Sequence, residues 1–306
     1  QMCIRDRSNL YDPVSYILTL KGKRLRPILT LMAADIFSDS YKPGLDAALA
    51  VEVFHNFSLV HDDIMDSAEL RRGNVTVHKK WNVSTGILSG DVMLIQAYQL
   101  FENYEGEVFV DLAKLFSKTA IEVCEGQQYD VDFETRDDVK IADYLKMITY
   151  KTAVLLGASM KMGAIIARAN KDDQNKIYDF GKYLGIAFQL QDDYLDAFGD
   201  ESKFGKKIGG DILENKKTFL YLKAIEFLGD ENKSQLLALY SNNNISEEKI
   251  IKAKVLFKES GSVDYTIKEI KKYTNSAFEI LESLNISKEK KKLLYEFGNS
   301  LMDRNI

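Results

Sequence analysis

Hydrophobic residues recur every three to four positions along almost the whole chain, which is the pattern of helices with one buried face. The segment 45–66 is apolar on nearly all sides, which predicts a buried central helix, with apolar residues at Leu45, Leu49, Phe54, Phe57 and Val60. We expect further helices, with an error of about 2–4 residues at each end, over 84–105, 107–131, 138–168, 172–199, 215–229, 231–241, 246–258, 262–284 and 287–302.

No segment shows the alternation of a half-buried strand, and no Asn-Gly or Asp-Gly hairpin is evident. The first ten residues, QMCIRDRSNL, lack helical periodicity, and we expect them to be frayed or non-native. The chain shows no linker and no long internal repeat. The pattern therefore predicts an all-α fold in a single domain, residues 1–306, built around long helices.

Composition limits the classes of function. Hydrophobic residues make up 45% of the 306 residues, and the net charge of −5 argues against a nucleic-acid partner. Cys3 and Cys124 form no spacing motif and indicate a reducing compartment, so we expect a cytoplasmic protein. No apolar run reaches the roughly 18–20 residues that span a bilayer, and we expect no transmembrane segment.

Two clusters of aspartates stand directly behind apolar stretches, HDDIMD at 61–66 and QDDYLD at 191–196. Positions four apart share a helix face, so Asp62 points the same way as Asp66, and Asp192 the same way as Asp196. Carboxylates this close repel one another and need cations, and oxygen ligands suit Mg²⁺ completed by water and phosphate. Two solvated helix faces are the alternative. If the two helices face each other, six aspartates line one cavity mouth, which suits a diphosphate ligand.

Basic motifs extend this pattern. GKRLRP at 22–27 places Lys23 and Arg26 at a helix start, and RRG at 71–73 supplies Arg71 and Arg72 shortly after the first acidic cluster. Arginines bind phosphate bidentately, which favours a second anion site beside the metal site. Ordinary surface charge is the alternative for either motif taken alone.

Weaker polar signals lie further along the chain. YKT at 150–152 puts Lys151 and Thr152 inside a largely apolar helix, where the lysine could contact a phosphate or extend to water. NKK at 215–217 offers Lys216 as a further cation.

Together these motifs, with FQLQDDYLD and GKKIGGD, resemble those of the trans-isoprenyl diphosphate synthases, the polyprenyl synthetase family, in order and spacing. The resemblance implies the isoprenoid synthase fold, a bundle of long helices around a central cavity. It implies a trans-prenyltransferase that condenses isopentenyl diphosphate with dimethylallyl, geranyl or farnesyl diphosphate to give a short-chain prenyl diphosphate. It also implies three Mg²⁺ ions that hold the allylic diphosphate, and a homodimer.

The resemblance assigns roles position by position. The metal-binding motifs correspond to Asp62, Asp63, Asp66, Asp192, Asp193 and Asp196. Contacts to the allylic diphosphate correspond to Arg71, Lys151, Gln189, Lys206 and Lys216. The isopentenyl diphosphate site corresponds to Lys23, Arg26, His55 and Arg72. Thr152 and the Gln189 amide correspond to groups near the carbocation, so the resemblance gives catalytic roles to Arg71, Lys151, Thr152 and Gln189. Gln127 and Asp130 correspond to a polar helix segment behind the first metal site.

The length of the prenyl product is predicted from the residues one and two helical turns before Asp62. Small Ser58 leaves space, whereas Phe57 and Phe54 could form a floor or be ordinary core. This combination resembles geranylgeranyl diphosphate synthases, with farnesyl or longer-chain synthases as alternatives. A terpene cyclase and a non-catalytic subunit of a heteromeric synthase are the alternatives of another class. A cyclase would lack GKRLRP and the second DDxxD, and such a subunit would lose motif aspartates.

Overall fold

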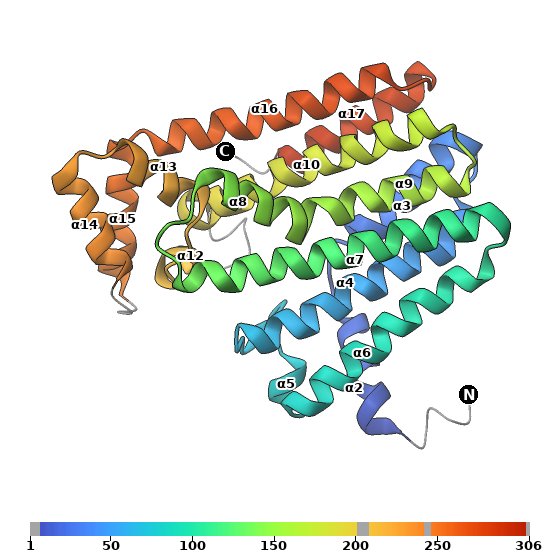
Figure 1. The fold of residues 1–306 in the computed structure, drawn as a ribbon, viewed down its shortest axis with the longest axis horizontal. Coiled ribbons are helices and arrows are strands. Elements are labelled where there is room, and N and C mark those ends of the chain that lie inside the picture. The colour runs from blue at the N-terminus through green and yellow to red at the C-terminus, as the bar shows by residue number, and fades with distance from the viewer. Residues whose placement is uncertain (1–6, 201–207, 242–245, 304–306) are drawn as a thin grey trace. The chain divides into compact units, whose positions relative to one another are not determined.

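The computed structural model describes residues 7–200, 208–241 and 246–303, and these residues form helices joined by short loops (Figure 1). The all-α prediction is confirmed. The chain divides into two compact units, Gln1–Lys118 with Ala158–Gln174, and Thr119–Gly157 with Asn175–Ile306. The prediction of a single domain stays a prediction. No helix of the described ranges is both long enough and apolar enough to cross a membrane.

Most of the first unit is a set of helices connected in chain order. Its elements are α2 (Ser8–Thr19), α3 (Leu25–Ser38), η1 (Lys42–Gly44), α4 (Leu45–Met65), β1 (Leu70–Arg71), β2 (Asn74–Val75), α5 (Val77–Lys80), α6 (Val83–Gln99) and η2 (Leu100–Asn103). It also includes the beginning of α7 (Gly106–Thr135), the end of α9 (Val154–Ile166) and the beginning of α10 (Lys171–Phe198).

The second unit contains the remainder of α7, α9 and α10 and the C-terminal helices. Its other elements are α8 (Ile141–Ile148), η3 (Thr149–Ala153), α12 (Gly210–Leu213), α13 (Phe219–Phe227), α14 (Asp230–Tyr240), α15 (Glu247–Glu259), α16 (Ser262–Ser283) and α17 (Lys288–Met302). Helices α14 and α15 lie side by side, as do α16 and α17 (Figure 1).

Helix α4 carries the first aspartate cluster and packs mainly against α6 and α3. Its buried face is rich in alanine and ends in aromatic and aliphatic residues: Ala47, Ala48, Ala50, Val51, Phe54, Phe57 and Val60. The expectation that the helix is buried on all sides is wrong at its start, because Leu45 is 45% exposed and Leu49 54% exposed. Small alanines allow the neighbouring helices to approach closely, and this packing leaves the two leucines outside.

Two elements depart from the sequence prediction. Helix α2 begins at Ser8, within the ten residues expected to be frayed, although it contains Pro13. A two-residue hairpin pairs Leu70 with Val75, and its turn has positive φ at Arg72 (53°) and Gly73 (75°). This turn carries no Asn-Gly or Asp-Gly signal, because the first of its two left-handed positions is occupied by arginine, which rarely adopts positive φ.

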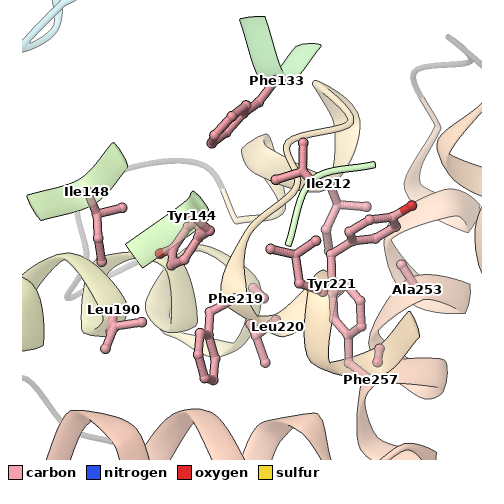
Figure 2. Close-up of a cluster of buried hydrophobic side chains, with 14 of the residues drawn as sticks. Phe133, Tyr144, Ile148, Leu190, Ile212, Phe219, Leu220, Tyr221, Ala253 and Phe257 are labelled. Atoms are coloured by element: carbon pink, nitrogen blue, oxygen red, sulfur yellow. The ribbon is translucent and has the colours of Figure 1, made fainter. Parts of the chain in front are cut away.

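A large hydrophobic cluster fills the second unit (Figure 2). It joins α8, α10, α12, α13 and α15 through buried side chains that include Tyr144, Leu190, Ile212, Phe219 and Phe257. Tyr221 stacks on Tyr240 in the same cluster with ring centroids 4.2 Å apart. This packing fixes the positions of α8 and α10, which carry polar residues on their other sides.

The predicted helix 138–168 is interrupted by η3, a π-helical turn. Two glycines of neighbouring helices allow the backbone of this turn to be enclosed. A Cβ on Gly126 of α7 would contact the Lys151 nitrogen and lie 2.6 Å from the Tyr150 carbonyl carbon, and a Cβ on Gly185 of α10 would lie 2.7 Å from the Ala153 Cα. Single π-helical turns are frequent at functional sites, because they turn side chains away from the regular helical direction.

We predict that Gly126→Ala destabilises the protein by about 1–3 kcal/mol, because its methyl group meets backbone atoms that cannot rotate away. The loss should appear although alanine is normally the better helix former by about 1 kcal/mol. Urea unfolding measures it, with Gly229→Ala as control, since nothing lies within 4 Å of a Cβ at that position. Wild-type stability in Gly126→Ala would contradict the close approach of α7 to the π-helical turn.

Candidate active site

The first aspartate cluster occupies the last turn of α4. The Asp66 amide donates to the Asp62 carbonyl at 2.9 Å, so helical geometry extends through Asp66 and both side chains lie on one side of the helix. Asp62 is partly exposed and Asp66 is exposed, whereas Asp63 is only 1% exposed. The cluster therefore combines two carboxylates that reach solvent with one that is buried.

Arg71 at the end of β1 binds this cluster. Its Nε donates to Asp63 Oδ1 at 2.8 Å, and its Nη2 donates to Asp62 Oδ2 at 3.2 Å. Burial raises the pKa of Asp63, and the hydrogen bond from Arg71 opposes that rise. The other oxygen of Asp63 is buried and has no hydrogen-bond partner among the described residues. The hairpin thus presents a guanidinium directly to the acids that would otherwise repel one another.

The second cluster lies near the end of α10. Asp192 and Asp196 are partly exposed, and Asp193 is 8% exposed. The Tyr144 hydroxyl donates to Asp193 Oδ2, and Gln189 Nε2 donates to Asp193 Oδ1 at 2.9 Å. Burial, followed by the charge of Asp211, raises the pKa of Asp193 well above its usual value. As in the first cluster, the middle acid is the buried one.

Asp196 also fixes the start of α12. Its Oδ2 accepts from the Asp211 amide at 3.0 Å, and its carbonyl accepts from the Gly209 amide at 2.7 Å. Gly209 and Asp211 of the motif GKKIGGD are therefore anchored to the second cluster. Lys206 lies outside the described residues.

Side chains from the π-helical turn meet polar residues of α7 and α10. Lys151 Nζ lies 2.6 Å from Asp130 Oδ2, and the Thr152 hydroxyl donates to Gln189 Oε1 at 3.1 Å. Lys151, Thr152 and Gln189 are thus brought together in one unit with Asp193. Sequence reasoning named Asp130 but not its pairing with Lys151, since that pairing depends on helix packing.

Lys216 follows α12 and lies 2.9 Å from Glu214 and 3.8 Å from Asp211. Burial lowers the pKa of Lys216, but Asp211 and Glu214 outweigh this effect, so the pKa is raised and the amine stays charged. The neighbouring Lys217 donates to the Phe133 carbonyl at 3.1 Å and to the Arg136 carbonyl, which caps the end of α7. Of the two lysines in NKK, the first therefore faces acids and the second has a structural role.

A separate basic group gathers around the start of α3. Arg26 Nη1 lies 3.1 Å from His55 Nε2. Burial and the charge of Arg26 lower the pKa of His55 well below its usual value, so its Nε2 accepts the hydrogen bond in the neutral form. Burial lowers the pKa of Arg26 to about 10, which still leaves it charged at neutral pH. The Arg26 Nε is buried without a hydrogen-bond partner among the described residues.

Arg24, which sequence reasoning did not single out, organises the loop that precedes α3. It adopts a left-handed conformation (φ 50°), forms an ion pair with Glu52, and donates to the carbonyls of Leu18 at 2.7 Å and Leu20 at 2.8 Å. Arg72 donates to the same Leu20 carbonyl at 3.4 Å. Lys23 lies exposed on this loop. The only sequence signal for Arg24 was its place between two basic motif residues.

Of the candidate chain-length residues on α4, Phe54 and Phe57 are buried and Ser58 is partly exposed. Phe54 is fully buried, with ring centroids 5.5 Å from Phe57 and 5.0 Å from Phe116 of α7. Phe57 also contacts the ring of His61 at 4.8 Å. The Ser58 hydroxyl donates back to the His55 carbonyl at 2.8 Å. Phe54 thus belongs to an aromatic cluster of the first unit.

The proposed site residues of the described ranges are distributed over the two units. The first cluster, Lys23, Arg26, His55, Arg71 and Arg72 belong to the first unit, and the second cluster, Lys151, Thr152, Gln189 and Lys216 belong to the second. The prediction that all six aspartates line one cavity mouth stays a prediction.

Comparison with known proteins gives consistent matches over nearly the full chain. The Polyprenyl synthetase family model matches residues 7–256. The geranylgeranyl diphosphate synthase of Sulfolobus acidocaldarius is 38% identical over 284 residues, covering 92% of this chain and 86% of that protein. The geranylfarnesyl diphosphate synthase of Natronomonas pharaonis is 34% identical and covers 99% of this chain and 92% of that protein.

Solved structures of related proteins give similar matches. A crystal structure of geranylgeranyl pyrophosphate synthase is 55% identical, with a TM-score of 0.93 and coverage of 98% of this chain and 93% of that chain. A geranylgeranyl pyrophosphate synthase from Corynebacterium glutamicum, solved in complex with isoprenyl diphosphate and magnesium, is 26% identical, with a TM-score of 0.87 and coverage of 96% and 91%. Because the motifs, the all-α fold and these matches extend over nearly the whole chain, it belongs to the polyprenyl synthetase family of trans-prenyltransferases.

Proposed function

We propose that this protein joins isopentenyl diphosphate to an allylic diphosphate and that its product is geranylgeranyl diphosphate. The observation that carries the proposal is the near full-length similarity to geranylgeranyl diphosphate synthases. The pairing of Arg71 with the first aspartate cluster and the polar group around Lys151 and Gln189 support it. A family member of this kind needs diphosphate-binding cations beside acids, and both units supply them.

Mg²⁺ fits the donor set. Asp62 and Asp66 lie one helical turn apart and reach solvent, and the same holds for Asp192 and Asp196. No three His, Cys, Asp or Glu side chains of the described ranges converge into a metal site by themselves. Since Mg²⁺ usually takes one or two carboxylates and completes its shell with water and phosphate, each cluster would supply part of the coordination.

We propose three ions, as the family resemblance implies. When bound, Mg²⁺ supplies a Lewis acid that neutralises the charge of the departing diphosphate.

The protein's own cations would bind the two diphosphates. Arg71, Lys151 and Lys216 are proposed to contact the allylic diphosphate, together with Lys206 outside the described residues. Lys23, Arg26, His55 and Arg72 are proposed to hold isopentenyl diphosphate. The buried Arg26 Nε without a partner supports this site, because a buried guanidinium N–H needs an acceptor and a phosphate oxygen would provide one.

The carbon chemistry follows from these positions. The bond between the allylic carbon and its diphosphate breaks, and the bound cations stabilise the leaving group. The oxygens of Thr152 and Gln189 are proposed to face the resulting allylic cation. The double bond of isopentenyl diphosphate attacks that cation and forms the new carbon–carbon bond. The proton lost afterwards is proposed to pass to the departed diphosphate, since the motifs include no dedicated base.

We also propose that the protein is a homodimer. Helix α6 exposes Val83, Ile87, Leu88 and Ile95, each at 43% or more, and the first turn of α7 exposes Phe109 and Val110. Exposed apolar side chains gathered on neighbouring elements are typical of protein–protein interfaces. The cytoplasmic location stays a prediction from cysteine content.

The direct test is incubation of the pure protein with isopentenyl diphosphate and each allylic primer, followed by sizing of the products. We expect a twenty-carbon diphosphate in the presence of Mg²⁺ and no turnover in EDTA, with activity restored by added Mg²⁺. Products of fifteen carbons would favour a farnesyl synthase. Products of twenty-five carbons, as the name of the Natronomonas relative suggests for that protein, would also overturn the product assignment.

We predict that Gly22→Ala raises the KM for isopentenyl diphosphate by about tenfold, with a much smaller change in kcat. A Cβ at Gly22 would lie 2.7 Å from Arg72 Cζ, so the guanidinium must move, while the backbone of Gly22 suits alanine because its φ is not positive. Steady-state kinetics with each substrate varied separately measure the effect, with Gly229→Ala as control. An unchanged KM for isopentenyl diphosphate would remove Arg72 from that site.

We predict that Phe57→Ala shifts the product distribution to longer chains, because it removes one aromatic ring from the proposed floor. Phe101→Ala is the matched control, since Phe101 is fully buried beside Phe116 but lies on η2 rather than α4. Its products should keep the wild-type length. Chromatographic sizing decides, and longer products from both variants would assign the floor to the aromatic cluster rather than to Phe57.

A further inference from the structure

Tyr144 on α8 is a buried tyrosine to which the sequence motifs assign no role. It is 1% exposed and lies in the hydrophobic cluster of the second unit, near Ile148, Leu190 and Phe219 (Figure 2). Its ring centroid is 6.2 Å from that of Phe219. A buried phenol needs a hydrogen-bond partner, and the Tyr144 hydroxyl finds one in Asp193.

The Asp193 carboxylate sets the direction of a chain of hydrogen bonds. The Gln189 side chain presents its NH₂ group to Asp193, with its Nε2 2.9 Å from Asp193 Oδ1. The Gln189 carbonyl oxygen is thereby turned to Thr152, whose hydroxyl donates to it at 3.1 Å. With Tyr144 on Asp193 Oδ2, both carboxylate oxygens accept hydrogen bonds from the protein.

We propose that Tyr144 is a positioning residue of the catalytic site: by holding Asp193, it fixes the orientation of the Gln189 amide and the Thr152 hydroxyl. The inference rests on the proposed function, in which these two groups face the allylic cation. Asp193 then acts as an oriented acceptor inside the protein, and the partly exposed Asp192 and Asp196 are the residues of this cluster available to the metal.

The chemistry of the side chain explains why an aspartate is needed at this position. An asparagine would carry one acceptor and one donor group, and either amide could then turn round while keeping its hydrogen bonds. Only a group that accepts at both oxygens enforces a single direction from Tyr144 to Thr152. Without the Tyr144 hydroxyl, one oxygen of a buried carboxylate loses its donor and the rotation of the carboxylate is no longer fixed.

The first experiment compares Tyr144→Phe with wild type in steady-state kinetics. We expect kcat to fall about tenfold, the size of one lost hydrogen bond to a charged group. The KM of each substrate and the Mg²⁺ concentration for half-maximal rate should change less than about twofold, since no substrate or metal contact is removed. Tyr221→Phe is the control, because Tyr221 belongs to the same buried cluster and stacks on Tyr240. It should retain wild-type kcat.

A double-mutant cycle separates positioning from general packing. In a Gln189→Ala background, Tyr144→Phe should cost less than about twofold in kcat, because its effect acts through the missing amide. If the fold-losses in kcat of Tyr144→Phe and Gln189→Ala multiply in the double variant, Tyr144 acts independently of Gln189 and the proposal is wrong.

Asp193→Asn changes the central residue of the hydrogen-bond chain from Tyr144 to Thr152 and keeps the side-chain volume. It therefore remains a test of the proposal if Tyr144→Phe fails to fold. We expect a similar loss of kcat, a further loss of less than about twofold when Asp193→Asn is added to Gln189→Ala, and an unchanged Mg²⁺ requirement. A raised Mg²⁺ requirement would make Asp193 a metal ligand and overturn the proposal. An active wild type with an unaffected Tyr144→Phe overturns this inference alone, whereas an inactive wild type overturns the proposed function on which it rests.

Discussion

The buried carboxylate at the centre of each aspartate cluster is the constraint on which the surroundings of both clusters depend. A carboxylate removed from water must be matched by donors or cations, because its desolvation otherwise costs several kcal/mol or forces it to take up a proton. Asp63 is matched by the guanidinium of Arg71, and Asp193 by the hydroxyl of Tyr144 and the amide of Gln189. In each case the donor belongs to another part of the chain or another helical turn, and satisfying the acid also fixes the donor in place.

This arrangement divides the work within each DDxxD motif. The first and last acids reach solvent, where a metal and a diphosphate can approach them, while the middle acid organises the protein behind them. A motif of adjacent carboxylates thus serves two purposes at once in the proposed function: the outer pair supplies charge for ligands, and the inner acid fixes a side chain that is proposed to contact the substrate. Arg71 and Gln189, each held by a middle acid, are both residues to which the family resemblance gives catalytic roles.

Backbone features support the same positions. The π-helical turn Thr149–Ala153 presents Lys151 and Thr152, and it is enclosed by helices whose glycines permit close approach. The left-handed Arg24 ties the loop before α3 to Glu52, and the left-handed Arg72 forms the turn that brings Arg71 to the acids. Left-handed conformations are unfavourable for arginine, and each of these arginines makes side-chain hydrogen bonds that offset the cost. Rare local geometry therefore occurs at or next to residues proposed to bind diphosphate, such as Arg72 and Lys151.

The sequence by itself determined the fold class, most helices, the two aspartate clusters and the family, because helical periodicity and motif spacing are local properties of the chain. The order of motifs was also enough to name Arg71, Lys151, Thr152 and Gln189. Only the tertiary structure decided which acids are buried, since Asp62 and Asp63 are adjacent and chemically identical in the sequence. It alone showed the hairpin, the π-helical turn and the exposure of Leu45 and Leu49, which depend on how closely neighbouring helices approach. Tyr144 was beyond the reach of sequence reasoning, because its contact with Asp193 joins residues 49 positions apart through the packing of α8 and α10.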